Sequence, residues 1–155
     1  MGKALNTWLK LKKELPLDEE AILNIHVAAH FIQSKTEKLC AKFGITAGQY
    51  NVLRILKGIY PQGHPRCEII TRMIDSSPDI TRLIDRLEKQ GFVERIRSKE
   101  DRRLSLTRIT SKGLKVLEKM QPQIDKIQKL FTSNLTNEEC MKLSFLTEKI
   151  YAHLL

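Results

Sequence analysis

The arginine side chains of this sequence are concentrated in one segment. Nine of the ten arginines lie between residues 66 and 108, whereas the seventeen lysines are spread along the whole chain. A guanidinium is a planar fork of N–H donors that fits a phosphate group or the edge of a guanine, whereas scattered lysines mainly support solubility. Residue type and placement together make residues 66–108 the segment in which a site for phosphates or base edges is to be sought.

The middle of this segment predicts a helix with one basic face. Apolar residues at positions 80, 83, 84 and 87 have the spacing of a core-facing stripe, and Gly91 ends the pattern. Ser77 followed by Pro78 predicts the N-cap and the first helical residue. On the outer face, residues near the helix start are placed for base edges, and Arg86 and Lys89 for phosphates. The candidate residues of this helix are Ser77, Pro78, Asp79, Thr81, Arg82 and Arg86.

A hairpin is predicted to follow this helix. Val93–Arg97 and Leu104–Ile109 are the expected strands, and the polar residues 98–102 join them. An arginine at the tip suits the narrow, electronegative minor groove of DNA, and Asp101 is placed to hold the guanidinium of Arg103. The candidate residues of the hairpin are Arg97, Lys99, Asp101, Arg102 and Arg103.

Each of these features has a simpler explanation when taken alone. A basic amphipathic helix is often a solvated surface helix, and a charged turn often serves solubility. A hairpin of this kind can also serve contact between proteins. Five basic residues around one hairpin, directly after a basic helix, favour DNA binding over these alternatives. They are Arg97, Lys99, Arg102, Arg103 and Arg108.

Helices predicted upstream position the basic segment. Residues 1–15 form an arm or a short helix, and apolar residues at 22, 25, 29, 32, 39 and 43 predict a long helix that Gly44 ends. Thr46 and Gln49 form a capping box for the next helix, whose inner side carries positions 50, 53 and 56. Residues 61–65 hold two prolines and a glycine and predict a turn. A short helix with positions 67, 70, 73 and 74 facing inward follows.

Two further helices are expected after the hairpin. Thr110 or Ser111 caps a long helix with apolar positions 117, 120, 124, 127 and 131, and Pro122 should bend it or break its hydrogen bonds locally. Thr136 and Glu139 form a second capping box before a last helix with apolar positions 143, 146, 150 and 154. The stripes at both ends offer more apolar surface than a small central domain can cover, which favours burial against a partner.

The order of these elements defines the expected fold. Three short helices followed by a two-stranded hairpin make a winged helix-turn-helix, whose third helix can enter a major groove while the hairpin reaches the adjacent minor groove. The fold class is therefore mainly α with a small β-hairpin wing (α+β). We expect an N-terminal arm and first dimerisation helix over 1–45, a DNA-binding domain over 46–112, and C-terminal dimerisation helices over 113–155.

The motifs resemble those of the MarR family of bacterial transcriptional regulators. Residues 77–95 (SPDITRLIDRLEKQGFVER) resemble its recognition helix and first wing strand, and residues 98–103 (SKEDRR), 109–113 (ITSKG) and 44–50 (GITAGQY) resemble flanking parts. The resemblance implies a homodimer that binds a pseudo-palindromic operator, usually as a repressor released by a small ligand, an oxidant or a metal. It also assigns the wing pattern of the family to Asp101 and Arg103. Two-fold symmetry then predicts half-sites about 10 bp apart.

Residues that could sense a signal are few. In the resembled family, small ligands often occupy the crevice between the dimerisation helices and the winged domain, and His26, His30, Phe31 and Tyr50 are candidate lining residues. His26 and His30 also have the i, i+4 spacing of a zinc pair, although two further ligands would be needed. No metal or other cofactor is expected, and a metal-responsive regulator stays an alternative.

The three cysteines do not predict a disulfide framework. Cys40, Cys67 and Cys140 are odd in number and show no CxxC spacing. Cys67 and Cys140 stand at apolar helical positions and are expected in the core. Peroxide-sensing relatives carry a cysteine near the start of the first long helix, where residues 20–26 have none. A redox-responsive regulator is therefore the weaker alternative, since it needs an accessible thiol of low pKa.

Composition excludes several other classes. The 155 residues carry a formal charge of +9, with 41% hydrophobic and 29% charged residues, which argues against a disordered or fibrous chain. No apolar run approaches the roughly 20 residues of a membrane span, so the expected location is the cytoplasm. P-loop, dinucleotide-binding and nucleophile-elbow motifs are missing, and an enzyme is not expected.

Overall fold

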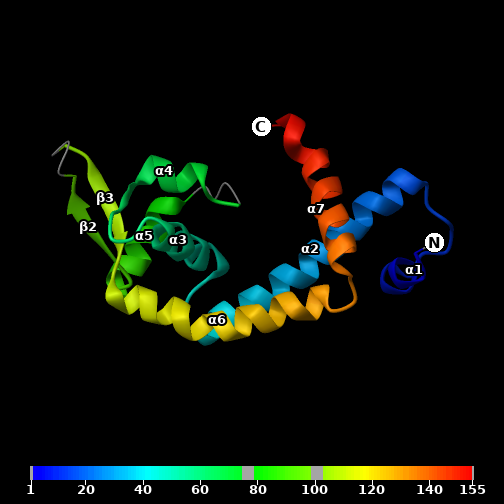
Figure 1. Ribbon diagram of the computed structural model, residues 1–155, viewed down its shortest axis with the longest axis horizontal. Helices are drawn as coiled ribbons and strands as arrows, with labels where there is room; N and C mark the ends of the chain where they lie inside the picture. The colour runs from blue at the N-terminus through cyan, green and yellow to red at the C-terminus, as the bar shows by residue number, and fades with distance from the viewer. Residues whose placement is uncertain (1, 75–78, 99–102, 155) are drawn as a thin grey trace.

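The computed structural model describes residues 2–74, 79–98 and 103–154. Figure 1 shows two groups of elements, a winged region with the sheet and a helical region with both termini. The helices α2 (Leu17–Lys42) and α6 (Ser111–Thr132) pack side by side and connect the two groups. The remaining elements are α1 (Lys3–Leu9), α3 (Ala47–Gly58), β1 (His64–Pro65), α4 (Arg66–Thr71), α5 (Ile80–Lys89), β2 (Val93–Arg97), β3 (Ser105–Ile109), α7 (Asn137–Tyr151) and a final 3-10 turn, Ala152–Leu154.

Local sequence signals set most of the helix ends. The predicted capping box of α3 is present: the Gln49 backbone N–H donates to Thr46 Oγ1 at 3.2 Å, and the Thr46 N–H donates to Gln49 Oε1 at 2.9 Å. Thr136 and Glu139 form the same arrangement at the start of α7. Gly44 ends α2 with a φ of 70°, a backbone conformation that suits glycine.

The sheet has three strands, one more than the sequence pattern predicts. β2 and β3 form the expected antiparallel hairpin, with Val93 opposite Ile109 and Arg97 opposite Ser105. The stretch expected to be only a turn contributes β1, because His64 and Pro65 pair with Thr107 and Leu106 of β3. Gly63 permits this approach, since a Cβ at that position would lie 2.6 Å from the Thr107 carbonyl oxygen.

The core of the winged region lies where α3, α5, β3 and α6 meet. Leu53 and Leu56 of α3 and Met120 of α6 are fully buried there. The expected inner face of α4 is partly wrong: Ile69 is buried and Met73 packs against the core, whereas Cys67, Ile70 and Ile74 are exposed. The helix is only six residues long, so the apolar spacing within it is too short to fix its rotation.

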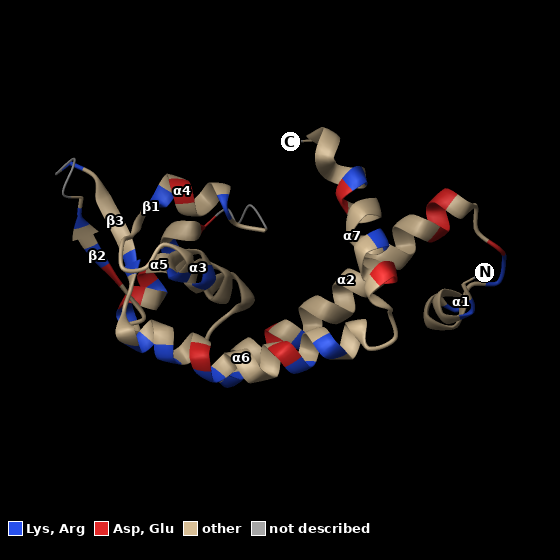
Figure 2. Ribbon diagram, in the orientation of Figure 1, with Lys and Arg blue, Asp and Glu red and all other residues tan. Residues whose placement is uncertain are grey.

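The helical region leaves a large apolar face exposed. None of the residues of α7 is buried, and the first half of the predicted stripe on α2 is exposed as well. The exposed apolar side chains of these two helices, together called the apolar face of α2 and α7 below, are Ile22, Ile25, Ile32, Met141, Leu143, Phe145, Leu146 and Ile150. In Figure 2 most of α7 and the middle of α2 are tan, without Lys, Arg, Asp or Glu. Within the described part of the chain, no helix is long and apolar enough to cross a membrane.

Candidate nucleic-acid interface

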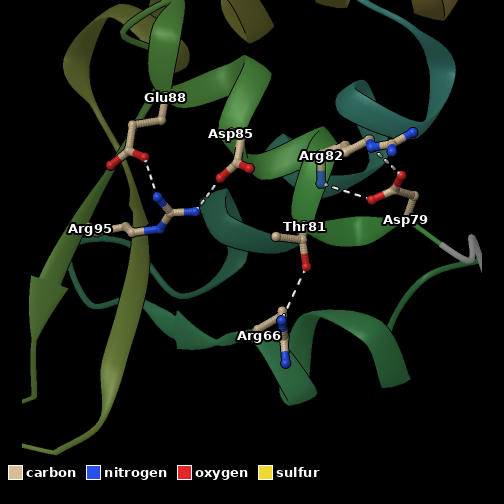
Figure 3. Close-up of polar contacts among 7 residues, drawn as sticks. All are labelled: Arg66, Asp79, Thr81, Arg82, Asp85, Glu88 and Arg95. Atoms are coloured by element: carbon tan, nitrogen blue, oxygen red, sulfur yellow. Dashed lines mark hydrogen bonds and ion pairs between the residues drawn. The ribbon is translucent and has the colours of Figure 1, made fainter.

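The start of α5 differs from the sequence prediction. Asp79 is the N-cap and Ile80 the first helical residue, so the helix starts two residues later than a Ser77 cap would place it. Ser77 and Pro78 themselves lie outside the described residues. The Arg82 backbone N–H donates to Asp79 Oδ1 at 3.1 Å, and Arg82 Nε lies 2.8 Å from Asp79 Oδ2. One carboxylate therefore caps the helix and holds an arginine of its outer face (Figure 3).

The basic face of α5 is present and faces solvent. Ile80, Ile84 and Leu87 are buried on the opposite side, as their spacing predicts. Arg82, Arg86 and Lys89 are all exposed, and they stand at i, i+4 and i+7. A helix with this division can lay its cationic side chains against DNA while its apolar side stays in the core.

A third face of α5 is occupied by arginines from the rest of the winged region. Arg66 Nη1 of α4 donates to Thr81 Oγ1 at 3.1 Å. Arg95 of β2 forms ion pairs with Asp85, through Nη2, and with Glu88, through Nη1 at 2.6 Å. Figure 3 shows Arg95 pointing from the strand toward both carboxylates. The hydrogen bond that Arg95 donates to the Asp85 carboxylate raises the pKa of Arg95, so the guanidinium stays charged in this setting.

Arg66 and Arg95 were not among the residues singled out from the sequence. Their contacts join α4 to α5 and α5 to β2, and only the packing of these elements brings the partners together. The sequence feature that points to Arg66 and Arg95 is their residue type, since both belong to the arginine-rich segment. Thr81 lies as predicted on α5, and its hydroxyl is engaged by Arg66.

The described part of the wing carries basic residues at its outer end. Arg97 is the last residue of β2 and Arg103 precedes β3, and both are exposed. Lys99, Asp101 and Arg102, the other wing candidates, lie outside the described residues. Arg108 is held on the sheet by Glu94 of the neighbouring strand, with Nη2 at 2.8 Å. Arg108 therefore links the two strands of the hairpin and is not one of the basic residues at its tip.

The four predicted pocket residues lie on two helices, three on α2 and Tyr50 on α3. Tyr50 borders a hollow of about 260 Å³ between α3 and α6, together with Arg54, Lys57, Gly58, Leu117 and Gln121. Burial raises the pKa of the Tyr50 hydroxyl. His26 and His30 are exposed on α2, and Phe31 contacts the rings of His30 and Trp8 at 5.8 and 4.7 Å between centroids.

The cysteines are distributed differently from the expectation. Cys40 is fully buried, and burial raises the pKa of its thiol to about 11. Cys67 is exposed and Cys140 half-buried, so neither is a core thiol. Over residues 2–74, 79–98 and 103–154, no three His, Cys, Asp or Glu side chains gather closely enough to hold a metal ion.

Comparison with known proteins places this arrangement in a family. Residues 45–105 match the family described as the MarR family. The HTH-type transcriptional regulator PapX of Escherichia coli is 32% identical over 122 residues, which cover 79% of this chain and 74% of PapX. The chain belongs to the MarR family. The members of this family are transcriptional regulators and not enzymes, and the resemblance in the sequence motifs is confirmed.

Solved MarR-family structures share the fold over nearly their whole length. A MarR transcription factor from Planctomyces limnophilus is 32% identical, with a TM-score of 0.66 over 88% of this chain and 98% of that protein. A mutant MarR from Escherichia coli, crystallised with operator DNA, is 26% identical, with a TM-score of 0.73 over 88% of this chain and 99% of that one. The mainly α fold with a winged helix is therefore confirmed.

Proposed function

We propose that this MarR-family regulator is a homodimer that binds a pseudo-palindromic operator in double-stranded DNA and represses transcription until a small ligand releases it. The observation that carries the proposal is the exposed basic face of α5, formed by Arg82, Arg86 and Lys89, beside a wing whose outer end carries Arg97 and Arg103. The complex of a related MarR with operator DNA supports the same type of partner.

The apolar face of α2 and α7 supports the homodimer. A helix such as α7, with no buried residue and with apolar side chains on several sides, is expected to be covered by another chain. Under this proposal residues 46–112 bind DNA, and residues 1–45 and 113–155 pair the two copies. Two recognition helices then face one duplex, at half-sites about 10 bp apart.

The hollow beside Tyr50 is the proposed place for a releasing ligand. It lies between α3 of the winged region and α6, which continues into the helical region, so an occupant would contact both. Arg54 and Lys57 at its border favour a small anionic molecule. A regulator of this type acts on bacterial DNA, in the cytoplasm.

Selection from a random DNA duplex pool tests the proposal. The expected result is one enriched pattern with two inverted half-sites whose centres are about 10 bp apart. Binding to that operator should weaken steeply with salt, because each phosphate contact releases counterions. An affinity that barely depends on salt, or a pool without enrichment, would contradict operator binding and favour a winged helix used for protein contact.

Removing one wing arginine tests the contribution of the hairpin. Arg103→Ala should weaken operator binding about 5- to 100-fold, since a minor-groove arginine is lost, while fold and dimer stay intact. Titration of a labelled operator at constant salt gives the affinity, and sedimentation gives the oligomeric state. An unchanged affinity would remove Arg103 from the interface and leave α5 as the main contact.

A further inference from the structure

The carboxylate of Asp79 uses its two oxygens for different tasks. Oδ1 accepts the backbone N–H of Arg82 and so fixes the carboxylate at the helix start. The cap thereby directs Oδ2 at the side chain of Arg82, and Oδ2 lies 2.8 Å from Arg82 Nε. The cap holds the short side chain of Asp79, so one partner of this ion pair is fixed, unlike in a pair of two long surface side chains.

This contact leaves a defined edge of the guanidinium for another partner. Arg82 has five N–H donors, and the contact with Asp79 uses the Nε side. The two terminal nitrogens form the opposite edge, and the side chain of Arg82 is 79% exposed. Arg82 is also the third residue of α5, within the helix start that contacts base edges in helix-turn-helix proteins.

We propose that Asp79 positions Arg82 to contact a guanine in the major groove of the operator. Guanine presents two acceptors side by side, O6 and N7, which match two parallel N–H donors; adenine presents a donor beside its N7, and the pyrimidines lack the pair. This inference rests on the proposed function, since it requires operator binding.

The other cations of the basic face lack such a fixed partner. Within the described residues, neither Arg86 nor Lys89 has an ion pair, and both stand later on α5. A cation without a fixed direction suits a phosphate, which accepts donors from many angles. Base recognition therefore belongs to Arg82, and the guanine lies opposite the start of α5.

Asp79→Asn separates the cap from the ion pair. Asparagine caps a helix as well as aspartate does, so thermal stability should not change. The amide cannot attract Arg82 Nε as the carboxylate does, and the guanidinium loses its direction. We expect the preference for guanine over the other bases at one position per half-site to fall about 10-fold. The slope of log affinity against log salt should stay the same, because Asp79 makes no phosphate contact.

Two further variants provide the comparison. Arg82→Lys keeps the positive charge but replaces the planar fork by a single ammonium group, and it should reduce the same guanine preference. Arg86→Ala should weaken binding to every duplex, lower the salt slope by about 1 and leave the guanine preference intact. The probe is a set of operator duplexes that carry each of the four bases at every half-site position.

Two outcomes would overturn the inference. One is a full guanine preference in Asp79→Asn, and the other is an operator whose base preferences do not change in Arg82→Lys. If the wild-type chain enriches no DNA sequence at all, operator binding is contradicted, and the role of Asp79 in guanine recognition is contradicted as well. If the wild-type chain selects an operator, the two variants decide the role of Asp79 alone.

Discussion

Gly113 lies in crowded surroundings and Gly58 in open space, and both are helical. Substituting alanine at each position therefore gives a matched comparison. A Cβ at Gly113 of α6 would lie 2.3 Å from the Phe92 carbonyl oxygen and 2.7 Å from Ile109 Cγ1, whereas one at Gly58 of α3 would meet nothing within 4 Å. Gly113→Ala should lower the free energy of unfolding by about 1–3 kcal/mol through overpacking. Gly58→Ala should raise it by about 0.4–1 kcal/mol, because alanine has less freedom to lose on folding. Urea unfolding of both variants measures the two signs, and equal signs would contradict the close contact at Gly113.

The cysteines differ in their exposure, and the thiolate is the reactive form of a cysteine. Because burial raises the pKa of Cys40 to about 11, this thiol stays protonated at pH 8 and is also shielded. A thiol reagent at pH 8 should label the exposed Cys67 quickly and Cys40 only on unfolding. Mass spectrometry of the labelled peptides checks this, with Cys67→Ser as the control. Rapid labelling of Cys40 in the folded protein would show that α2 opens locally.

At the scale of elements, the orientation of α5 depends on its contacts with β2. Arg95→Ala leaves Asp85 and Glu88 without their cation, on the helix that we assign to DNA. The three side chains are between 35% and 43% exposed, so the stability loss should stay below about 1 kcal/mol. DNA affinity should fall several-fold on every duplex at low salt, because two carboxylates then repel the phosphates.

A triple variant removes the two negative charges as well as Arg95, so the charge is balanced again although the ion pairs are still absent. Arg95→Ala combined with Asp85→Asn and Glu88→Gln should recover most of the lost affinity if repulsion is the cause. Arg108→Ala removes an arginine whose partner, Glu94, is on the sheet, and it should change DNA affinity less. A triple variant as weak as Arg95→Ala would mean that Arg95 acts by holding α5 in place. Duplex titrations at two salt concentrations separate these results.

The elements that the sequence predicts well are those with local signals. Capping boxes, glycine stops and long apolar stripes fix α2, α3, α6 and α7 nearly to the residue, because the groups involved lie within one or two turns of each other. β1 was missed since its pairing with β3 joins residues more than forty positions apart. The start of α5 was predicted two residues early because Ser77 and Asp79 are both good caps, and the sequence alone does not choose between them.

The candidate site follows the same rule. The basic face of α5 follows from helical spacing, so Arg82, Arg86 and Lys89 could be named in advance. The arginines that brace α5, Arg66 and Arg95, act across elements and could not. The pocket candidates rest on residue type near one corner; Tyr50 borders the hollow between α3 and α6, whereas His26 and His30 are exposed on α2.

At the scale of the whole molecule, the apolar face of α2 and α7 should decide the oligomeric state. Leu146→Glu puts a charge into the middle of this face, where a partner chain would have to bury it. We expect the variant to sediment as a folded monomer and to bind the operator at least about 10-fold more weakly, since one helix then contacts one half-site. Lys115→Glu, on the exposed side of α6 near the sheet, should leave the dimer intact. A Leu146→Glu dimer as tight as the wild type would place the interface elsewhere.

The continuity of α6 has a mechanical consequence. Its first turns, with Gly113, Leu117 and Met120, are packed in the winged core, and the helix then runs through Pro122 to Thr132, with α2 packed against it. At 1.5 Å per residue it is a rod of roughly 33 Å. A tilt of about 5° at one end displaces the other by about 3 Å over that length, which is the span of a hydrogen bond. Under the proposed function, a small rearrangement among the terminal helices would therefore move the winged region far enough to take Arg82 away from a base edge.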